Sequence, residues 1–381
     1  MGKLGFQALA WRDGVLDYCL RSRVRQLKVL DPNPDKLREI KENIPDCFVV
    51  YRMYKPFEEQ QALLVDPIAG ANRFADQILR TSDAARGLID AYEGLNEPDA
   101  LWGDNALRYN EWTAEYARIM HQNGCRTVAY NWSVGCPQGY YQGDGNANPD
   151  EFREGLRQHW AVFLDGLRAS DYLGLHEYSA PKMWNAASWL CLRYRRVYDI
   201  LPPDCRQPLL ITECGIDSGV TQPFPGLHGW RWYGYSEEEY LEQLRWYADE
   251  IDKDDYVVGA HIFQVGSYDP QWESFSILGC EKIASYIAAQ TAQTKEAPMA
   301  WDRHRIYDEW QKLFGGQGYN PADAFGQIIK SNPDREYGVF VGGYHVEEPF
   351  IYAYTTVGIF CYDKRSGKAV FATSEEELPF K

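Results

Sequence analysis

Residues 91–98 read AYEGLNEP, a short apolar run that closes on the carboxylate of Glu97 just before a proline. A second run, LLITECG at residues 209–215, has the same form and carries Glu213 near its end. Short apolar runs bounded by glycine or proline are typical of buried strands. The two stretches therefore predict two strands, each with a glutamate at its C-terminal end.

Runs of the same kind recur along the chain and alternate with longer amphipathic stretches. The predicted strands are Leu4–Leu9, Val24–Leu30, Cys47–Met53, Ala91–Asn96, Thr127–Trp132, Tyr172–Tyr178, Pro208–Cys214 and Tyr256–Phe263. The predicted helices are Pro34–Asn43, Asn72–Arg86, Ala106–Asn123, Pro149–Arg168, Ala187–Ile200 and Ser236–Lys253. Ser236 stands three residues before Glu239, the spacing of a helix capping box.

This alternation predicts parallel βαβ units and an α/β fold, and eight such units match a (β/α)₈ TIM barrel. A doubly wound sheet is the competing architecture. It would normally carry a phosphate-binding glycine loop, but no GxGxxG follows the first strand and no GxxxxGK[ST] occurs in the chain.

The predicted barrel spans residues 1–293 and closes with a helix near Cys280–Gln293. Residues 294–300 are predicted to be a linker, and residues 301–381 a small C-terminal α+β domain. In this domain we expect a helix at Trp301–Phe314 and β-rich runs at Gly338–Val341, Ile351–Ile359 and Ala369–Thr373. A sugar-binding role and a structural role for it both stay open.

The composition argues against several classes of partner. The chain has 381 residues and a net charge of −16, which would be repelled by nucleic acid and by an anionic membrane surface. No run reaches the roughly 18 apolar residues of a membrane span. No signal peptide is recognisable, so we expect a cytoplasmic protein by default, or a secreted one if a leader has been removed. The nine cysteines show no paired CxxC spacing, so no zinc is expected; reduced thiols are the simplest reading, and a few disulfides stay possible.

Active sites of TIM barrels lie at the C-terminal ends of the strands, where Glu97 and Glu213 are expected. Carboxylates from two strands are what glycoside hydrolysis requires. The pattern Asn96-Glu97-Pro98 on strand four with Thr212-Glu213 on strand seven resembles clan A of the retaining glycoside hydrolases, over residues 4 to about 290. The resemblance implies that Glu97 is the acid/base, that Glu213 is the nucleophile and that Asn96 binds the sugar 2-hydroxyl.

Strand six, with His176 and Tyr178 on one face, is similar to the strand-six pattern of the clan. The resemblance implies that Tyr178 donates a hydrogen bond to the nucleophile and that His176 lines the sugar site. Glu177 has the opposite parity, so we expect it outside the barrel and paired with a helix.

Further substrate-binding candidates are the strand-end or loop residues Arg52, Trp132, Trp230, Trp232, Gln264 and Trp272. The clan often has a tryptophan at the end of strand eight, where this chain has Phe263 and Gln264, and Trp272 is the candidate substitute. A buried Glu93 would need a partner, for which Lys28 and Arg52 are candidates.

The expected function is therefore hydrolysis of a β-linked oligo- or polysaccharide by double displacement, with no metal or organic cofactor. Two alternatives stay open: a transglycosidase using the same site, and a non-catalytic carbohydrate-binding or envelope-associated barrel. The sequence does not identify the sugar, because barrel loops set specificity and the fold does not.

Overall fold

The computed structural model describes residues 2–139, 149–221 and 226–290, and, nearer the C-terminus, residues 345–347, 350–355, 358–363, 365–366 and 368–372. The chain divides into two compact units, Met1–Thr294 and Lys295–Lys381. The predicted linker at 294–300, the predicted helix Trp301–Phe314 and the predicted run Gly338–Val341 lie outside the described residues.

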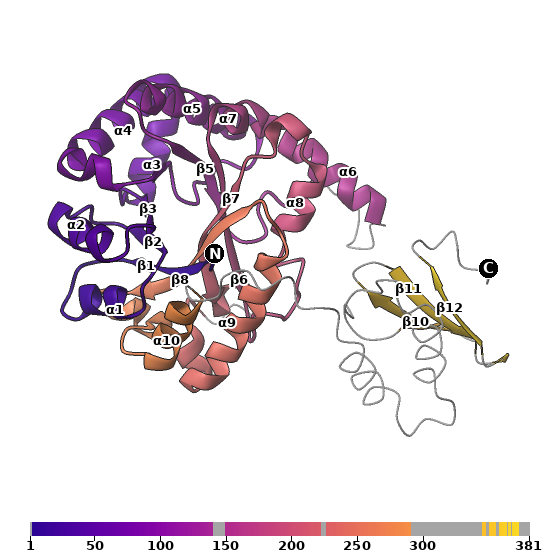
Figure 1. Cartoon of the computed structure of the whole chain (residues 1–381). Helices are drawn as coiled ribbons and strands as arrows, with labels where there is room; N and C mark the ends of the chain where they lie inside the picture. Colours follow the sequence, from indigo (N-terminus) through magenta and orange to yellow (C-terminus); the bar gives the residue numbers. More distant parts are fainter. Residues whose placement is uncertain are drawn as a thin grey trace. The chain divides into compact units, whose positions relative to one another are not determined.

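The first unit is a closed barrel of eight parallel strands in the order β1 to β8, surrounded by helices, so the predicted TIM barrel is confirmed (Figure 1). The strands are β1 (Leu4–Ala8), β2 (Gln26–Val29), β3 (Phe48–Tyr51), β4 (Ala91–Glu93), β5 (Thr127–Trp132), β6 (Tyr172–Ser179), β7 (Leu209–Ile216) and β8 (Val257–Val265). β8 pairs with β1, which closes the barrel.

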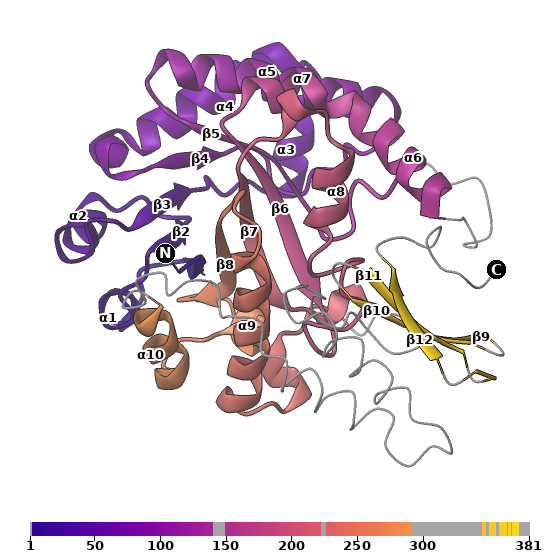
Figure 2. The same cartoon turned by 45° about the vertical axis from the view of Figure 1, so that its right-hand side comes forward.

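The helices of this unit form the outer layer, which Figure 2 shows from a second direction. They are α1 (Val15–Arg21), α2 (Pro34–Asn43), α3 (Phe57–Leu64), α4 (Pro67–Thr81), α5 (Gly103–Gln122), α6 (Pro149–Trp160), α7 (Leu164–Ala169), α8 (Tyr194–Ile200), α9 (Glu237–Asp252) and α10 (Glu281–Ala289). The described helices include none long and apolar enough to cross a membrane.

Local sequence signals explain several helix starts. Asn33 accepts a hydrogen bond from the Lys36 amide and caps α2, and Ser236 and Glu239 form the predicted capping box of α9. The helix predicted at Asn72–Arg86 begins and ends five residues earlier in the structure. It is α4, which begins at Pro67, is capped by Asp66 and ends at Thr81. Two short helices, α1 and α3, were not predicted because seven or eight residues give little periodicity.

The barrel interior has an apolar layer with a charged layer above it. Val50, Ala91 and Leu210 belong to a buried apolar cluster near the N-terminal ends of the strands. Side chains alternate along a strand, so the next inward positions lie two residues on, at Arg52 and Glu93. The lower layer therefore fills the barrel, while the upper layer places charge beneath the C-terminal mouth.

The described part of the second unit is an antiparallel sheet with the strand order β12-β11-β10-β9. Its strands are β9 (His345–Glu347), β10 (Phe350–Thr355), β11 (Gly358–Asp363) and β12 (Lys368–Ala372). The β-rich run predicted at Ile351–Ile359 corresponds to β10 and the start of β11, which pair as the two arms of a hairpin, with Thr355 opposite Gly358.

Candidate active site

Glu213 lies on β7, and its carboxylate is surrounded by donors from three other strands or strand ends. Oε1 accepts from Lys28 Nζ at 3.1 Å and from Arg52 Nη1 at 2.8 Å. Oε2 accepts from the Tyr178 hydroxyl at 2.8 Å, the contact that the resemblance implies. The side chain is only 8 % exposed, so these charges act with little screening by water.

The ionised form of Glu213 is favoured by this arrangement. Burial acts to raise its pKa, but the charges of His176, Lys28 and Arg52 and the hydrogen bond from Tyr178 outweigh burial and hold the pKa well below its usual range. Burial, together with the Glu213 charge, raises the pKa of Tyr178 well above its usual value, which keeps that hydroxyl protonated as a donor. A dry carboxylate held as an anion is what a nucleophile requires.

Glu97 occupies a loop rather than the strand end. β4 ends at Glu93, so the predicted strand at Ala91–Asn96 is too long, and Glu97 adopts a left-handed backbone conformation with φ 47°. Such a conformation costs roughly 1–3 kcal/mol in a non-glycine residue and needs support from its surroundings. The support comes from β5, since the Glu97 amide donates to the Asn131 carbonyl at 3.2 Å.

The end of β5 is itself irregular. Tyr130 and Asn131 both have positive φ, and the pairing of β5 with β6 shifts register between Ala129 and Trp132. The buried Tyr109 hydroxyl of α5 lies 2.7 Å from the Tyr130 carbonyl and 3.3 Å from the Leu95 carbonyl, so one helix side chain joins both backbone segments. This clamp, formed by Tyr109, Tyr130 and Leu95, therefore holds the loop that carries Glu97 against the end of β5.

His176 brings the two glutamates together. Its Nδ1 atom lies 2.5 Å from Glu97 Oε1 and 3.6 Å from Glu213 Oε2. A register shift between Leu175 and His176 pairs His176 with Glu213 across β6 and β7. The distance between Glu97 Oε1 and Glu213 Oε2 therefore cannot exceed the sum of these two distances.

Asn96 belongs to the same cluster. Its Oδ1 atom accepts from Arg52 Nη1 at 2.7 Å, the same nitrogen that contacts Glu213. The backbone amide of Asn96 donates to Gln60 Oε1 of α3 at 2.7 Å. The structure thus brings together Glu97, Glu213, Asn96, His176, Tyr178 and Arg52 at the C-terminal end of the barrel.

Three of the residues predicted to contact the sugar, Trp132, Trp230 and Gln264, are buried and contact other parts of the protein. Trp132 is 1 % exposed and packs against Tyr109 and Phe163, because the register shift in β5 turns it toward the outer helices. Trp230 is 2 % exposed, stacks on Tyr240, and belongs to the 3₁₀ helix Trp230–Tyr233. Neither tryptophan therefore presents a ring face to a ligand.

The third is Gln264, which is fully buried at the end of β8. Its amide donates to the Trp272 carbonyl at 2.9 Å and accepts from the Ser267 amide at 3.1 Å. Gln264 therefore shapes the loop after β8 instead of contacting a sugar. Trp272 is partly exposed and packs edge-on against Phe263, which in turn contacts Tyr178.

Trp232 is 50 % exposed and stacks on His228. Two further exposed aromatic residues, Tyr54 after β3 and Tyr268 after β8, lie on loops after barrel strands. Sequence reasoning missed Asp217, just after β7. Burial and the Glu97 charge raise the pKa of Asp217 to about 6, although the hydrogen bond from the Gly219 amide acts to lower it. A polar residue just past a strand end is the signal that could have found it.

Glu177 faces outward, as its parity predicts. Its carboxylate accepts from the Leu192 and Tyr194 amides and from the Tyr247 hydroxyl. It therefore holds the segment before α8 and the helix α9 against the barrel, and takes no part in the cleft.

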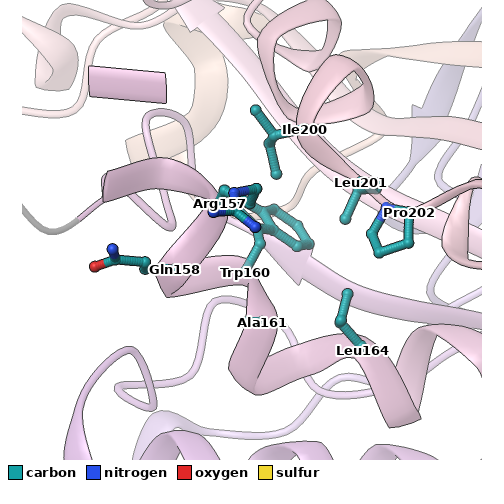
Figure 3. Close-up of a pocket in the computed structure, with 8 residues that line it drawn as sticks. All are labelled: Arg157, Gln158, Trp160, Ala161, Leu164, Ile200, Leu201 and Pro202. Atoms are coloured by element: carbon teal, nitrogen blue, oxygen red, sulfur yellow. The ribbon is translucent and has the colours of Figure 1, made fainter. Parts of the chain in front are cut away.

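The described residues contain no group of three or more histidine, cysteine, aspartate or glutamate side chains arranged to hold a metal ion. The cysteines of the barrel are free thiols, most of them buried. A pocket of about 370 Å³ lies elsewhere, among α6, α7 and the end of α8 (Figure 3). Its lining is mainly apolar and includes none of the residues grouped around Glu213.

Comparison with known protein families and with curated proteins gives no match. Solved structures that resemble this chain include a Bifidobacterium dentium β-glucuronidase in complex with coumarin-3-O-glucuronide (13 % identity over 76 % of this chain and 46 % of that one, TM-score 0.46). Another is a β-D-glucuronidase of Dictyoglomus thermophilum (12 % identity, 76 % and 50 %, TM-score 0.47). A third is a glucosidase from Croceicoccus marinus (14 % identity, 77 % and 67 %, TM-score 0.47).

The chain thus spans about half the length of these glucuronidase chains. Likenesses this weak carry no argument about activity, and the fold assignment rests on the closed eight-stranded barrel itself.

Proposed function

We propose that the protein is a retaining β-glycoside hydrolase, with Glu213 as nucleophile and Glu97 as acid/base. The observation that carries the proposal is that one histidine nitrogen reaches both carboxylates, at 2.5 and 3.6 Å. This closeness suits the spacing of about 5–5.5 Å in retaining enzymes better than the roughly 6.5–9.5 Å of inverting ones, which must admit a water between the carboxyl groups.

In the first step, a Glu213 carboxylate oxygen attacks the anomeric carbon of the sugar. The bond from that carbon to the leaving oxygen breaks, the electron pair stays on the leaving oxygen, and protonated Glu97 supplies its proton. In the second step, ionised Glu97 takes a proton from water, whose oxygen displaces Glu213 from the anomeric carbon. Two displacements at one carbon retain its configuration.

Arg52 and Asn96 assist in separate ways. The Arg52 guanidinium fixes Asn96 Oδ1, which leaves the Asn96 Nδ2 group as a donor for a sugar hydroxyl. The exposed rings of Trp232 and Trp272, on loops after β7 and β8, are the proposed aromatic contacts for a β-linked oligo- or polysaccharide. The chemistry proposed here needs no metal or organic cofactor.

A substrate panel tests the proposal. Nitrophenyl β-glycosides of several sugars and a set of β-glucans, mannans, xylans, chitosan and peptidoglycan are incubated with the protein and with Glu213→Gln. We expect release of nitrophenol or of reducing ends with at least one substrate, and turnover reduced by at least about 10⁴-fold in the variant. Binding without any release would support the non-catalytic barrel, and near-native activity of Glu213→Gln would refute the assignment of the nucleophile.

Acceptor sugars separate hydrolysis from transglycosylation. We expect free sugar as the main product at low acceptor concentration. A product in which most of the cleaved sugar is transferred to the acceptor instead of water would identify a transglycosidase on the same two glutamates.

A further inference from the structure

A fully buried lysine lies between two glutamates beneath the site. Lys28 Nζ is 3.0 Å from Glu93 Oε2 and 3.1 Å from Glu213 Oε1, and the side chains of Lys28 and Glu93 are 0 % exposed. These residues come from β2, β4 and β7, which do not pair with one another. Their side chains can therefore meet only across the interior of the barrel.

The main described contact of the Glu93 carboxylate is its ion pair with Lys28. Neither of its oxygens accepts a hydrogen bond from a described residue, although the ammonium group lies at ion-pair distance. An isolated ionised carboxylate in such a place would be costly, so the ion pair with Lys28 is what compensates it. Apart from His176, which is paired with Glu97, the group made by Lys28, Arg52, Glu93 and Glu213 carries two positive and two negative charges at rest.

The proposed reaction changes this balance. When the Glu213 oxygen bonds the anomeric carbon, the carboxylate becomes a neutral ester and the same four residues carry one excess positive charge. Without Glu93 the excess would be present before the reaction and would double in the glycosyl-enzyme. In a buried site each such charge is weakly screened.

We propose that Glu93 is a positioning residue for the nucleophile, which acts through Lys28 to limit how strongly the buried cations hold Glu213 in its ionised form. The inference rests on the proposed function, because it assigns Glu93 a role in the charge change of Glu213. In the proposed mechanism Glu93 touches neither the substrate nor the reacting atoms.

The consequence is opposite for the two chemical steps. Glycosylation removes charge from Glu213, so unbalanced cations oppose it. Deglycosylation restores that charge, so the same cations favour it. A loss of Glu93 should therefore slow the first step without slowing the second, whereas a general disturbance of the barrel would slow both.

The titratable and charged groups that face Glu213 come from several strands, and the substitution Glu93→Gln replaces none of them. They are Lys28 on β2, Arg52 after β3, Glu97 after β4, His176 and Tyr178 on β6, Cys214 on β7 and His261 on β8.

The two steps can be measured separately with a dinitrophenyl 2-deoxy-2-fluoro-β-glycoside of whichever sugar the substrate panel identifies. The rate of inactivation reports glycosylation, and the rate at which the purified labelled protein regains activity reports deglycosylation. For Glu93→Gln we expect the ratio of inactivation to reactivation rate to fall by about tenfold or more, the equivalent of one pKa unit at Glu213.

Two variants serve as controls. Glu93→Asp keeps the charge, and the double variant Lys28→Met/Glu93→Gln removes the pair and restores the balance among the remaining charges. In both, the ratio should return to within about threefold of the unsubstituted protein. The double variant also serves if Glu93→Gln does not fold. The single variant Lys28→Met leaves Glu93 as an uncompensated buried carboxylate. Its thermal midpoint should therefore lie several degrees below that of the double variant.

An unchanged ratio in Glu93→Gln, equal slowing of both steps, or a ratio in the double variant as low as in Glu93→Gln would overturn the role of Glu93 and leave the proposed function standing. A chain that is inactive on the whole panel would overturn the proposed function, and this inference with it.

Discussion

Glu213 and Glu97 have the same side chain, and their surroundings prepare them for different tasks. Glu213 is nearly buried and accepts from Lys28, Arg52 and Tyr178. Glu97 is 39 % exposed, with its carboxylate directed at His176 from a loop that faces the mouth. Unequal environments are what allow one carboxyl group to attack while the other exchanges protons with a leaving group and with water.

Replacing Tyr178 with phenylalanine tests the environment of Glu213. The change removes the hydrogen bond to Oε2, so the pKa of Glu213 should rise toward its ordinary value, and the acidic limb of the kcat/KM profile should move to higher pH. A hydrogen bond to a charged group is worth roughly 1.5–3 kcal/mol, so we expect a loss of about 10- to 150-fold in kcat/KM. A profile and a rate identical to those of the unsubstituted protein would show that the hydroxyl contributes nothing.

Replacing Glu97 with alanine tests its role as the acid. Protonation matters most for a poor leaving group, so phenyl glycosides should lose about 10²- to 10⁴-fold in kcat/KM while dinitrophenyl glycosides lose much less. Measuring both leaving groups on one sugar provides the check. Equal losses for the two would mean that Glu97 does not protonate the leaving oxygen.

At the scale of the elements, the site depends on irregular places where a strand departs from regular pairing. At the register shift in β5, the Asn131 carbonyl accepts a hydrogen bond from the Glu97 amide. The shift between β6 and β7 sets His176 beside Glu213. The Tyr109 hydroxyl of α5 then ties the end of β5 to the loop after β4.

Tyr109→Phe should therefore weaken both folding and activity. It leaves two buried carbonyls without this donor, which we expect to cost about 1–3 kcal/mol of unfolding free energy, measured by chemical denaturation. Because the loop that carries Glu97 loses its attachment, kcat should also fall for poor leaving groups. A variant that is destabilised but fully active would show that the clamp supports only the fold.

Hydrophobic periodicity and the spacing of Ser236 and Glu239 were enough to predict the barrel, most strand positions and the capping box of α9. The roles of Glu97 and Glu213, which the resemblance of their motifs implies, stay predictions. Periodicity could not predict the side on which Trp132 lies, because parity along β5 is lost at a register shift that no composition signal marks. The burial of Trp230 and Gln264 depends on packing by Tyr240 and by the loop after β8, which are distant or irregular in sequence. The left-handed backbone at Glu97 likewise follows from a tertiary contact.

At the scale of the whole molecule, the barrel buries titratable groups whose protonation is linked to folding. His261 is fully buried on β8, and its pKa is lowered to about 3, first by burial and then by the Lys28 charge. An unfolded histidine titrates near 6.5, so the unfolded chain binds a proton that the folded one does not. The stability that His261 contributes is thus present above pH 6.5 and is lost as the pH falls toward 3.

His261→Gln should remove this dependence. From pH 6.5 to about pH 4 the unsubstituted protein should lose stability relative to the variant, by up to about 1.4 kcal/mol for each pH unit. Thermal midpoints of both proteins across this range provide the measurement, and the contributions of other groups largely cancel in the difference. Parallel curves would contradict the assignment of a neutral, buried imidazole.

The proposed mechanism requires that Glu213 forms a covalent bond to the sugar and that Glu97 does not. The most direct measurement is mass spectrometry of the protein after reaction with a dinitrophenyl 2-deoxy-2-fluoro-β-glycoside of a sugar that it hydrolyses. We expect one fluorosugar per chain, attached to the peptide that contains Glu213, and no adduct in Glu213→Gln. A label on another residue, or hydrolysis of the natural substrate with inversion and no label, would contradict this mechanism.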